Sequence, residues 1–117
     1  MPSLLSQISS PDGVIWLGYG DAVVELVPTR KGVVTVHMDK GEADIPAALL
    51  LKQAFQWARK QLKARKVVAF IPSRNTPALH AAAHAGMQRE GYSPLSYYEN
   101  DMVDDLIYYG VELCHKH

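Results

Sequence analysis

The fold is decided by residues 67–92, which read VVAFIPSRNTPALHAAAHAGMQREGY. The apolar run at residues 67–71 is too short for a helix, so it predicts a buried strand. A helix should follow, with Thr76 able to cap it and Pro77 at its first position. Gly86 predicts the end of this helix, because glycine readily adopts the left-handed conformation found there. A strand, a helix and a return toward a sheet indicate an α/β unit.

Before this unit, the chain predicts an antiparallel meander. Strands are expected at residues 14–17, 22–27 and 33–38, with turns at residues 18–21 and 28–32. Residues 1–12 are polar and rich in turn formers, and they predict a short lead-in with one helical turn around Leu4, Leu5 and Ile8.

A long helix of ~18 residues is the strongest prediction outside the opening stretch. It should begin near Pro46, with Asp44 as a candidate cap or first-turn acid. Apolar side chains recur at helical spacing, at Ala47, Leu50, Leu51, Ala54, Phe55, Ala58 and Leu62. The other side is basic, so the helix should pack across the sheet with this side in water.

The topology of the sheet follows from the order of the elements. The strands at 33–38 and 67–71 should be parallel, because a right-handed helical crossover joins them. Breaks are expected at residues 93–94 and 99–101, followed by an antiparallel last strand at residues 106–113 and a tail at residues 114–117. These features predict a mixed α/β sheet in a single domain spanning residues 1–117.

Composition and charge exclude several classes of protein. The chain has 117 residues, 48% of them hydrophobic, which is enough for one core. Twelve basic and twelve acidic residues balance, so no global field favours nucleic acid or anionic lipid. No apolar run approaches the ~20 residues that span a bilayer, and no secretory signal is evident. The single cysteine disfavours a disulfide-stapled secreted fold, so a cytoplasmic location is expected.

The pattern of elements resembles the GNAT superfamily, the acetyl-CoA-dependent N-acetyltransferases. The residues that carry this resemblance are Asn75, Ala78, Gly86-Met87 and Glu90-Gly91, which match the N-x-x-A…G-F…E-G pattern with Met in place of Phe. The run VTVHM at residues 34–38 is similar to the central strand of small phage-encoded members, which often carry a histidine there.

The resemblance implies acetyl-CoA or another acyl-CoA as the cofactor, with its pantetheine arm between the strands at 33–38 and 67–71. The residues that the resemblance assigns to the cofactor are Val36, His37, Met38, Ala47, Asn75 and Ala78. It also implies an amine-bearing acceptor that must lose a proton, for which His37 and Glu25 are the candidate bases. Several tyrosines follow residue 90, and Tyr108 is taken as the candidate acid for the departing thiolate.

Two positions depart from the superfamily's pattern. Its pyrophosphate loop, [RQ]-x-x-G-x-[GA], has no matching register within residues 39–47, where Glu42 and Asp44 would face the phosphates and Pro46 lacks an N–H. Its usual acidic tyrosine, seven positions after the asparagine, is replaced by Ala82. A second hypothesis is therefore a catalytically inactive GNAT-like protein of phage or prophage origin. Such a protein would contact a protein partner or another copy through strand edges and residues 93–98.

Other candidate sites have simpler structural explanations. Asn75 is first a helix-capping residue, and His37 is expected to be half-buried in its strand. His80 and His84 have the spacing of two metal ligands on a helix, but no third ligand follows, so we predict no metal site.

Overall fold

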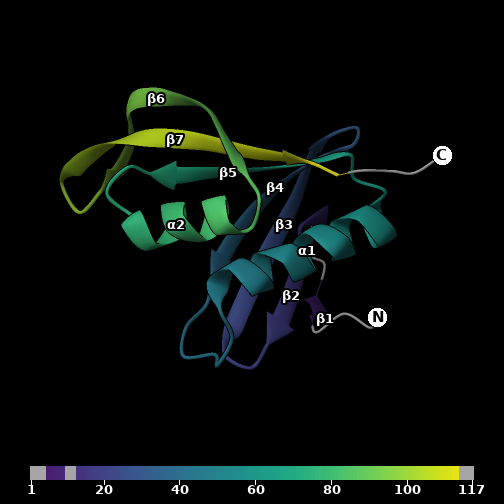
Figure 1. Ribbon diagram of the computed structural model, residues 1–117. Helices are drawn as coiled ribbons and strands as arrows, with labels where there is room; N and C mark the ends of the chain where they lie inside the picture. Colours follow the sequence, from purple (N-terminus) through teal and green to yellow (C-terminus); the bar gives the residue numbers. More distant parts are fainter. Residues whose placement is uncertain (1–4, 10–12, 114–117) are drawn as a thin grey trace.

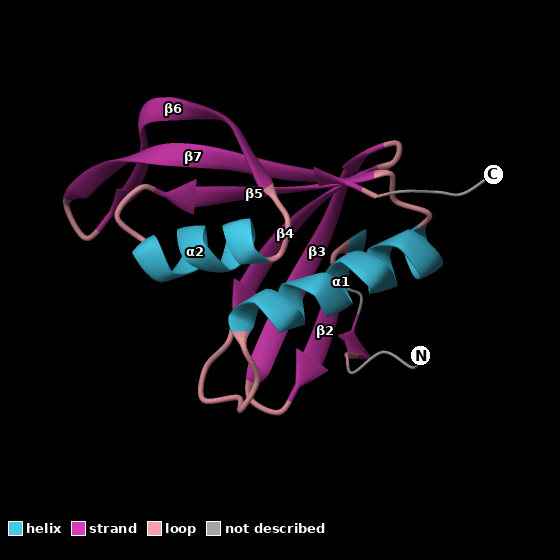
Figure 2. Ribbon diagram, viewed as in Figure 1, coloured by secondary structure: helices cyan, strands magenta, loops and turns pink. Residues whose placement is uncertain are grey.

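The computed structural model describes residues 5–9 and 13–113 of the chain. The strands are β1 (Ser6–Ser9), β2 (Ile15–Tyr19), β3 (Ala22–Arg30), β4 (Val33–Asp39), β5 (Lys66–Pro72), β6 (Gln88–Glu99) and β7 (Met102–Glu112). The helices are α1 (Ala47–Leu62) and α2 (Thr76–His84). Over these residues, seven strands form one sheet in the order β1-β2-β3-β4-β5-β7-β6. Both helices lie on the same face of this sheet (Figure 1 and Figure 2). The predicted mixed α/β class is confirmed.

The sheet combines an antiparallel part and a single parallel pair. Strands β1 to β4 form an antiparallel meander, and β7 pairs antiparallel with both β5 and β6. Between them, β4 and β5 are parallel, joined by α1 as the crossover. The predicted meander, long helix and parallel pair are therefore confirmed.

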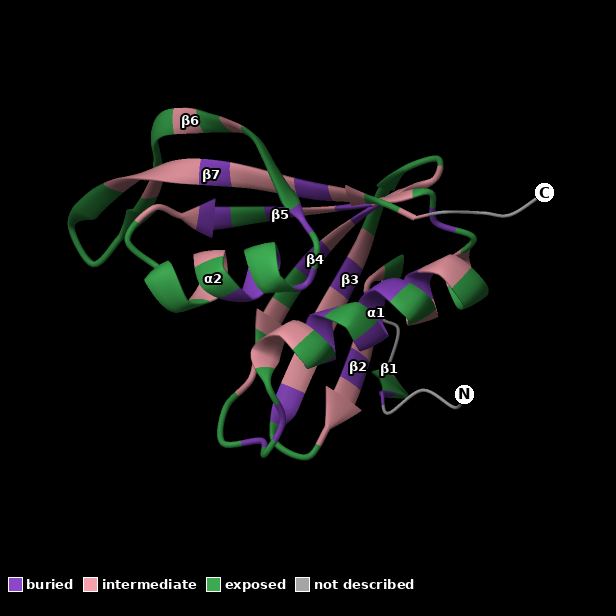
Figure 3. Cartoon of the chain, viewed as in Figure 1, coloured by how far each residue is buried: buried purple, intermediate pink, exposed green. Residues whose placement is uncertain are grey.

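The core lies between one face of the sheet and the two helices. Alternate residues of β2 and β3 point toward α1, so Leu17, Val24 and Leu26 are fully buried. Leu50 and Ala54 are fully buried from the helix side, which matches the predicted apolar stripe. Figure 3 shows the same division, with the buried residues concentrated between the helices and the strands.

The N-terminal prediction was wrong where the structure describes it. Residues 6–9 form strand β1, paired antiparallel with β2, and do not form a helical turn. Leu5 is buried in the core, whereas Ile8 is 62% exposed and lies over Gly18. A Cβ at Gly18 would approach Ile8 Cδ1 to 2.6 Å, so a glycine on β2 makes room for β1. The rest of the predicted lead-in, and the tail at 114–117, lie outside the described residues.

Of the three residues predicted as helix caps, Asn75 was confirmed, whereas Thr76 and Asp44 were wrong. Asn75, and not Thr76, is the N-cap of α2, because its side-chain oxygen accepts a hydrogen bond from the Ala78 N–H at 3.3 Å. Asp44 does not cap α1, which begins after Pro46 without a side-chain hydrogen bond at its N-cap. At the other end of α2, Gly86 has the predicted positive φ, 98°.

The predicted turn at residues 28–32 is shorter than expected. Strand β3 continues through Pro28, which lies opposite Val34, and ends at Arg30 after an irregular step in the pairing. The turn is confined to Lys31 and Gly32, and Gly32 supplies the positive φ of 78° that it needs.

The predicted breaks at residues 93–94 and 99–101 were also partly wrong. Strand β6 runs from Gln88 to Glu99 and accommodates Pro94 within a bulge where the pairing with β7 shifts. The bulge includes Leu95, which has a positive φ of 52°. A two-residue turn at Asn100 and Asp101, both with positive φ, then leads into β7. The expected loop is therefore the outer strand of a long hairpin at the edge of the sheet.

Candidate functional site

The sheet separates between its two parallel strands. Pairing between β4 and β5 runs from Val33 and Lys66 to Thr35 and Val68, and the structure gives no pairing beyond these residues. Both strands nevertheless continue, to Asp39 and Pro72. In a parallel ladder, the backbone groups on the facing edges bond to the neighbouring strand. This separation therefore leaves the N–H and C=O groups on those edges without a strand partner and available to a ligand.

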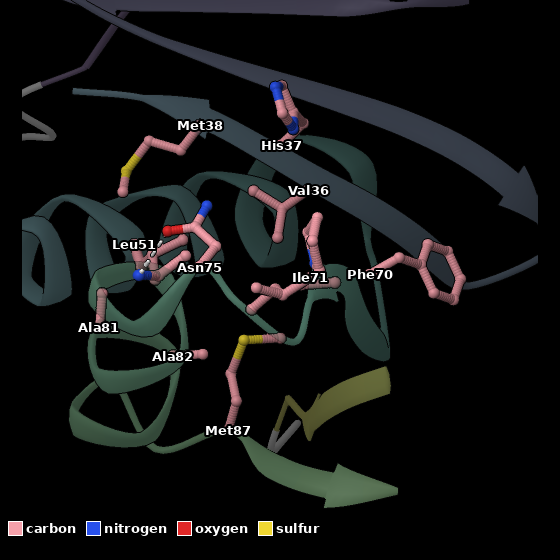
Figure 4. A pocket seen from close by; sticks show the side chains of 13 residues that line it. Val36, His37, Met38, Leu51, Phe70, Ile71, Asn75, Ala81, Ala82 and Met87 are labelled. Atoms are coloured by element: carbon pink, nitrogen blue, oxygen red, sulfur yellow. Dashed lines mark hydrogen bonds between the residues drawn. The ribbon is translucent and has the colours of Figure 1, made fainter. Parts of the chain in front are cut away.

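A cavity of about 100 Å³ lies where the two strands separate (Figure 4). It is lined by residues of β4, β5, both helices, the N-cap of α2 and the residue before β6, namely Val36, His37, Met38, Leu51, Ala69, Phe70, Ile71, Pro72, Asn75, Ala78, Ala81, Ala82 and Met87. Among these lining residues, His37 and Asn75 alone carry polar side chains. The cavity is therefore suited to an apolar or amide-bearing chain, which a few polar contacts would orient.

Five of the six predicted cofactor residues line this cavity: Val36, His37, Met38, Asn75 and Ala78. The sixth, Ala47, does not line it, but is the first residue of α1. Figure 4 shows Val36 pointing toward Ile71 and Met87, while His37 lies on the other side of β4. The apolar pattern of the other lining residues indicates burial without indicating a gap, so the sequence missed Leu51, Ala69, Phe70, Ile71, Pro72, Ala81, Ala82 and Met87.

Asn75 is both the N-cap of α2 and part of the cavity lining. Its side-chain oxygen caps α2, as the dashed line in Figure 4 shows, while its side-chain nitrogen has no partner among the described residues. This nitrogen therefore offers two N–H donors to a carbonyl group bound in the cavity.

The loop between β4 and α1 is held by its own hydrogen bonds. Lys40 Nζ donates to the Ala43 carbonyl at 2.7 Å, and the Gly41 N–H donates to Asp39 Oδ1 at 3.0 Å. Gly41 has a φ of 57°, and a Cβ there would lie 3.2 Å from the Asp21 carbonyl oxygen. This glycine is therefore required for the loop's path. The Gly41 N–H is already used within the loop, and Lys40 Nζ uses one of its three donors there.

The backbone N–H groups at the N-terminus of α1 have no capping partner, in contrast to the hydrogen-bonded loop that precedes them. The helix has no side-chain cap and no acidic residue in its first turn. The first donor with a helical partner is the Leu50 N–H, which bonds to the Pro46 carbonyl at 3.1 Å. The N–H groups of residues 47–49 are therefore available to an acceptor, and the helix dipole favours a negative one.

The two candidate bases lie opposite each other on the sheet face that carries no helix. Glu25 of β3 pairs directly with His37 of β4. His37 is exposed, not half-buried as predicted, and lines the cavity, whereas Glu25 is half-buried and does not line it. No hydrogen bond joins these two side chains in the described structure. The sheet therefore brings the predicted pair together without locking the histidine in one position.

Tyr108, the predicted acid, is not brought to the cavity. It lies on β7, and its ring packs edge-on against Phe70 with 4.9 Å between the ring centres. Ala82, where the resemblance predicts the superfamily's tyrosine, lines the cavity and is 1% exposed. The cavity therefore contains no phenol from either position.

A second, larger cavity of about 310 Å³ adjoins the first at Pro72 and Asn75. Its lining comes from the end of β5, the β5–α2 loop and the β6–β7 hairpin: Pro72, Arg74, Asn75, Tyr97, Glu99, Asn100 and Met102. The Tyr97 hydroxyl donates to Glu99 Oε2 at 2.7 Å, and this hydrogen bond is the main reason that the pKa of Tyr97 is raised. No feature of the sequence indicated this cavity, since it depends on the hairpin that was predicted as a loop.

Asp104 ties the hairpin to the loop that precedes α2. Its carboxylate accepts hydrogen bonds from the Ser73 hydroxyl, from the Arg74 N–H at 2.9 Å and from Arg74 Nε at 3.0 Å. The Ser73 N–H donates to the Asp105 carbonyl at 2.9 Å. The hydrogen bond from the Ser73 hydroxyl, followed by that from the Arg74 N–H, lowers the pKa of Asp104 far below its usual range.

We expect replacement of Asp104 by asparagine to lower the free energy of unfolding at neutral pH. The same replacement should make this free energy depend less on pH in the acid range. Because the folded-state pKa of Asp104 is depressed, its stabilisation is complete above about pH 4 and is lost progressively as the pH falls toward that pKa. Urea unfolding, measured from neutral pH to about pH 3, checks this. The control is Asp44→Asn, because Asp44 is an exposed carboxylate in a loop. If the free energy of unfolding of D104N falls as steeply with decreasing pH as that of the wild type, Asp104 is not the source of the acid dependence.

Two other features of the described residues bear on function. No group of three or more His, Cys, Asp or Glu side chains suited to a metal ion is found in residues 5–9 and 13–113, and His80 and His84 are both exposed on α2. Neither described helix is long and apolar enough to cross a membrane.

The chain is similar in structure to known acetyltransferases. No protein-family model and no curated protein matches its sequence. The ribosomal-protein-S5-alanine acetyltransferase from Vibrio fischeri matches with a TM-score of 0.72 and 15% identity, over 85% of this chain and 61% of that chain. The spermidine N-acetyltransferase from Vibrio cholerae, in complex with CoA and spermine, matches with a TM-score of 0.70 and 17% identity, over 78% and 57%.

A dodecameric structure of the Vibrio cholerae spermidine N-acetyltransferase also matches, with a TM-score of 0.72 and 15% identity, over 85% of this chain and 63% of that chain. The chain thus spans about three fifths of the length of these structures. At these identities the similarity concerns the fold. The chain has the GNAT-like mixed α/β fold, with its cavity between the two parallel strands.

Proposed function

We propose that the chain is an acyl-CoA-dependent N-acyltransferase. The observation that carries this proposal is the separation of β4 from β5 after Thr35 and Val68, with an apolar cavity in the gap. The same fold occurs in an acetyltransferase whose structure is in complex with CoA and spermine. Acetyl-CoA, or another acyl-CoA, is the proposed cofactor.

The residues present fit the pantetheine arm of such a cofactor. Its two amide groups would meet the free backbone edges of β4 and β5, while the side-chain nitrogen of Asn75 would donate to one carbonyl. Val36, Met38 and Ala78 would contact its methylene groups. The pyrophosphate would be bound by the open N–H groups at residues 47–49, at the positive end of the helix dipole.

When bound, the cofactor supplies an activated acyl group as a thioester. The chain's own contribution is to position it and to accept the proton of the attacking amine. We assign that proton to the imidazole of His37, which lines the cavity on the open face, with the Glu25 carboxylate opposite it to stabilise the imidazolium. Tyr108 as the acid remains a prediction, since it does not line the cavity.

Calorimetric titration with acetyl-CoA tests this function directly. Saturable binding is expected at cofactor concentrations between about 1 μM and 1 mM, the range in which enzymes usually bind their substrates. Absence of heat at millimolar acetyl-CoA would contradict the proposal. A structure of the complex would then be the second measurement, with the pantetheine expected between β4 and β5.

A second candidate function is a catalytically inactive GNAT-fold interaction protein. The observation that favours it is the apolar surface of the β6–β7 hairpin, where Tyr92, Leu95, Tyr98, Met102 and Val103 are all about half exposed or more. The absence of a phenol at residue 82 agrees with this alternative. A monomer by sedimentation, together with no partner recovered by pull-down from the native host, would count against it. A phage origin and a cytoplasmic location are proposed on the sequence alone.

A further inference from the structure

The first cavity, between β4 and β5, has an exposed mouth and a buried interior. Three of the residues that line it, His37, Phe70 and Asn75, are exposed and form the mouth. The residues that form its interior are all apolar, and each is at most 7% exposed: Val36, Leu51, Ala69, Ile71, Ala81, Ala82 and Met87. The cavity therefore leads from solvent into a space that apolar side chains surround.

Four of the interior residues define what we call the inner end of the cavity: Val36, Ile71, Ala82 and Met87. Figure 4 shows Val36 pointing toward Ile71 and Met87. The Met87 N–H donates to the Ala82 carbonyl at 3.0 Å, so the backbone holds these two walls together. Ala82 contributes only a methyl group, and a methionine side chain is unbranched and adaptable. The inner end can therefore adjust to an apolar chain.

The inner end differs from the mouth in the kind of group that it can bind. Among the described residues that line the cavity, the polar side chains are those of His37 and Asn75, and both lie at the mouth. A pantetheine arm carries amide groups, and burial of an amide is unfavourable unless it finds a hydrogen-bond partner. A hydrocarbon chain needs no such partner and gains free energy on leaving water. The inner end therefore suits the apolar part of an acyl group better than it suits the pantetheine arm.

We infer that the inner end binds a hydrocarbon chain longer than the methyl of an acetyl group, so that the preferred acyl donor is a short-chain acyl-CoA such as butyryl-CoA. The cavity, at about 100 Å³, is several times the roughly 10 to 15 Å³ that one water-sized group needs. Ala82 lies about 6 Å beyond Ala78 along α2, so a chain that passes Ala78 reaches the inner end within a few carbon atoms. This inference rests on the proposed function and specifies its acyl donor.

Calorimetric titration of the wild-type chain with acetyl-CoA and with butyryl-CoA tests this inference. Butyryl-CoA should bind about 15-fold more tightly, since each of its two further methylene groups contributes about fourfold when it is buried. Equal affinities, or tighter binding of acetyl-CoA, would overturn the inference and leave the proposed function standing. Absence of heat with both thioesters at millimolar concentration would overturn the proposed function and the inference together.

Ala82→Leu tests where the chain lies. The added branched side chain fills the inner end, so the ratio of the two affinities should fall from about 15 to about one. Ala83→Leu makes the same change at an exposed position of α2 that does not line the cavity, and it should keep the wild-type ratio. A wild-type ratio in folded A82L would overturn the inference, because the chain would then lie elsewhere. Thermal unfolding checks the fold of A82L, and if this variant does not fold, the wild-type comparison decides alone.

Discussion

Leu50→Ala is expected to lower the free energy of unfolding by about 3 kcal/mol, within the roughly 2 to 5 kcal/mol seen for large-to-small changes in cores. Leu50 is fully buried on α1, the helix that packs against the meander and joins the two parallel strands. Truncation removes its apolar contacts and leaves a cavity that the sheet can close only in part. Urea unfolding measures the change as a lower midpoint with an unchanged slope.

Leu49→Ala is the matched control for this experiment. Leu49 neighbours Leu50 on the same helix but is 41% exposed, and the two substitutions change helix propensity equally. The control should lose less than about 0.5 kcal/mol, as is usual at surface positions. Equal losses for L49A and L50A would mean that the helix does not pack on the sheet through the face described above.

The elements that could be predicted are those specified by local sequence. The stripe of α1 repeats every three to four residues, so its buried face followed from periodicity. Asn75 and Gly86 mark the two ends of α2 through capping and a positive φ, which are properties of single residues. The parallel pairing of β4 with β5 followed from the handedness of helical crossovers.

The elements that were missed depend on contacts distant in sequence. Strand β1 is extended because Gly18 of β2 leaves room for Ile8, a relation that the sequence of residues 6–9 does not contain. Pro94 normally indicates a break, yet β6 continues past it, because an edge strand needs no outward hydrogen bonds at a bulge. In both places, tertiary pairing outweighed local propensity.

In the candidate site, too, some residues could be predicted from the sequence and others depended on contacts distant in sequence. The apolar strand residues and Asn75 were predicted through the superfamily's pattern, and they line the first cavity. The absence of Tyr108 from the lining of that cavity could not be predicted, because it depends on β7 lying between β5 and β6. The second cavity also required the network around Asp104, which forms only when the β6–β7 hairpin lies against the β5–α2 loop.

Ala78→Phe is expected to abolish cofactor binding while leaving the fold intact. Ala78 lines the first cavity from α2 and is half-buried, so a phenyl ring there would project into a space of about 100 Å³. Because the ring would occupy the volume proposed for the pantetheine arm, the affinity for acetyl-CoA should fall at least about 100-fold, or roughly 2.7 kcal/mol. Calorimetry measures the affinity, and thermal unfolding checks the fold.

Ala83→Phe makes the same chemical change on the same helix at an exposed position that does not line the cavity. Both variants carry the same loss of helix propensity, so the difference between them reports the cavity alone. A83F should bind acetyl-CoA as the wild type does. If A78F folds and binds acetyl-CoA with wild-type affinity, the cofactor does not enter between β4 and β5, and the proposed function loses the observation on which it rests. If both variants lose binding equally, the effect comes from α2 as a whole, and the cavity is not the cause.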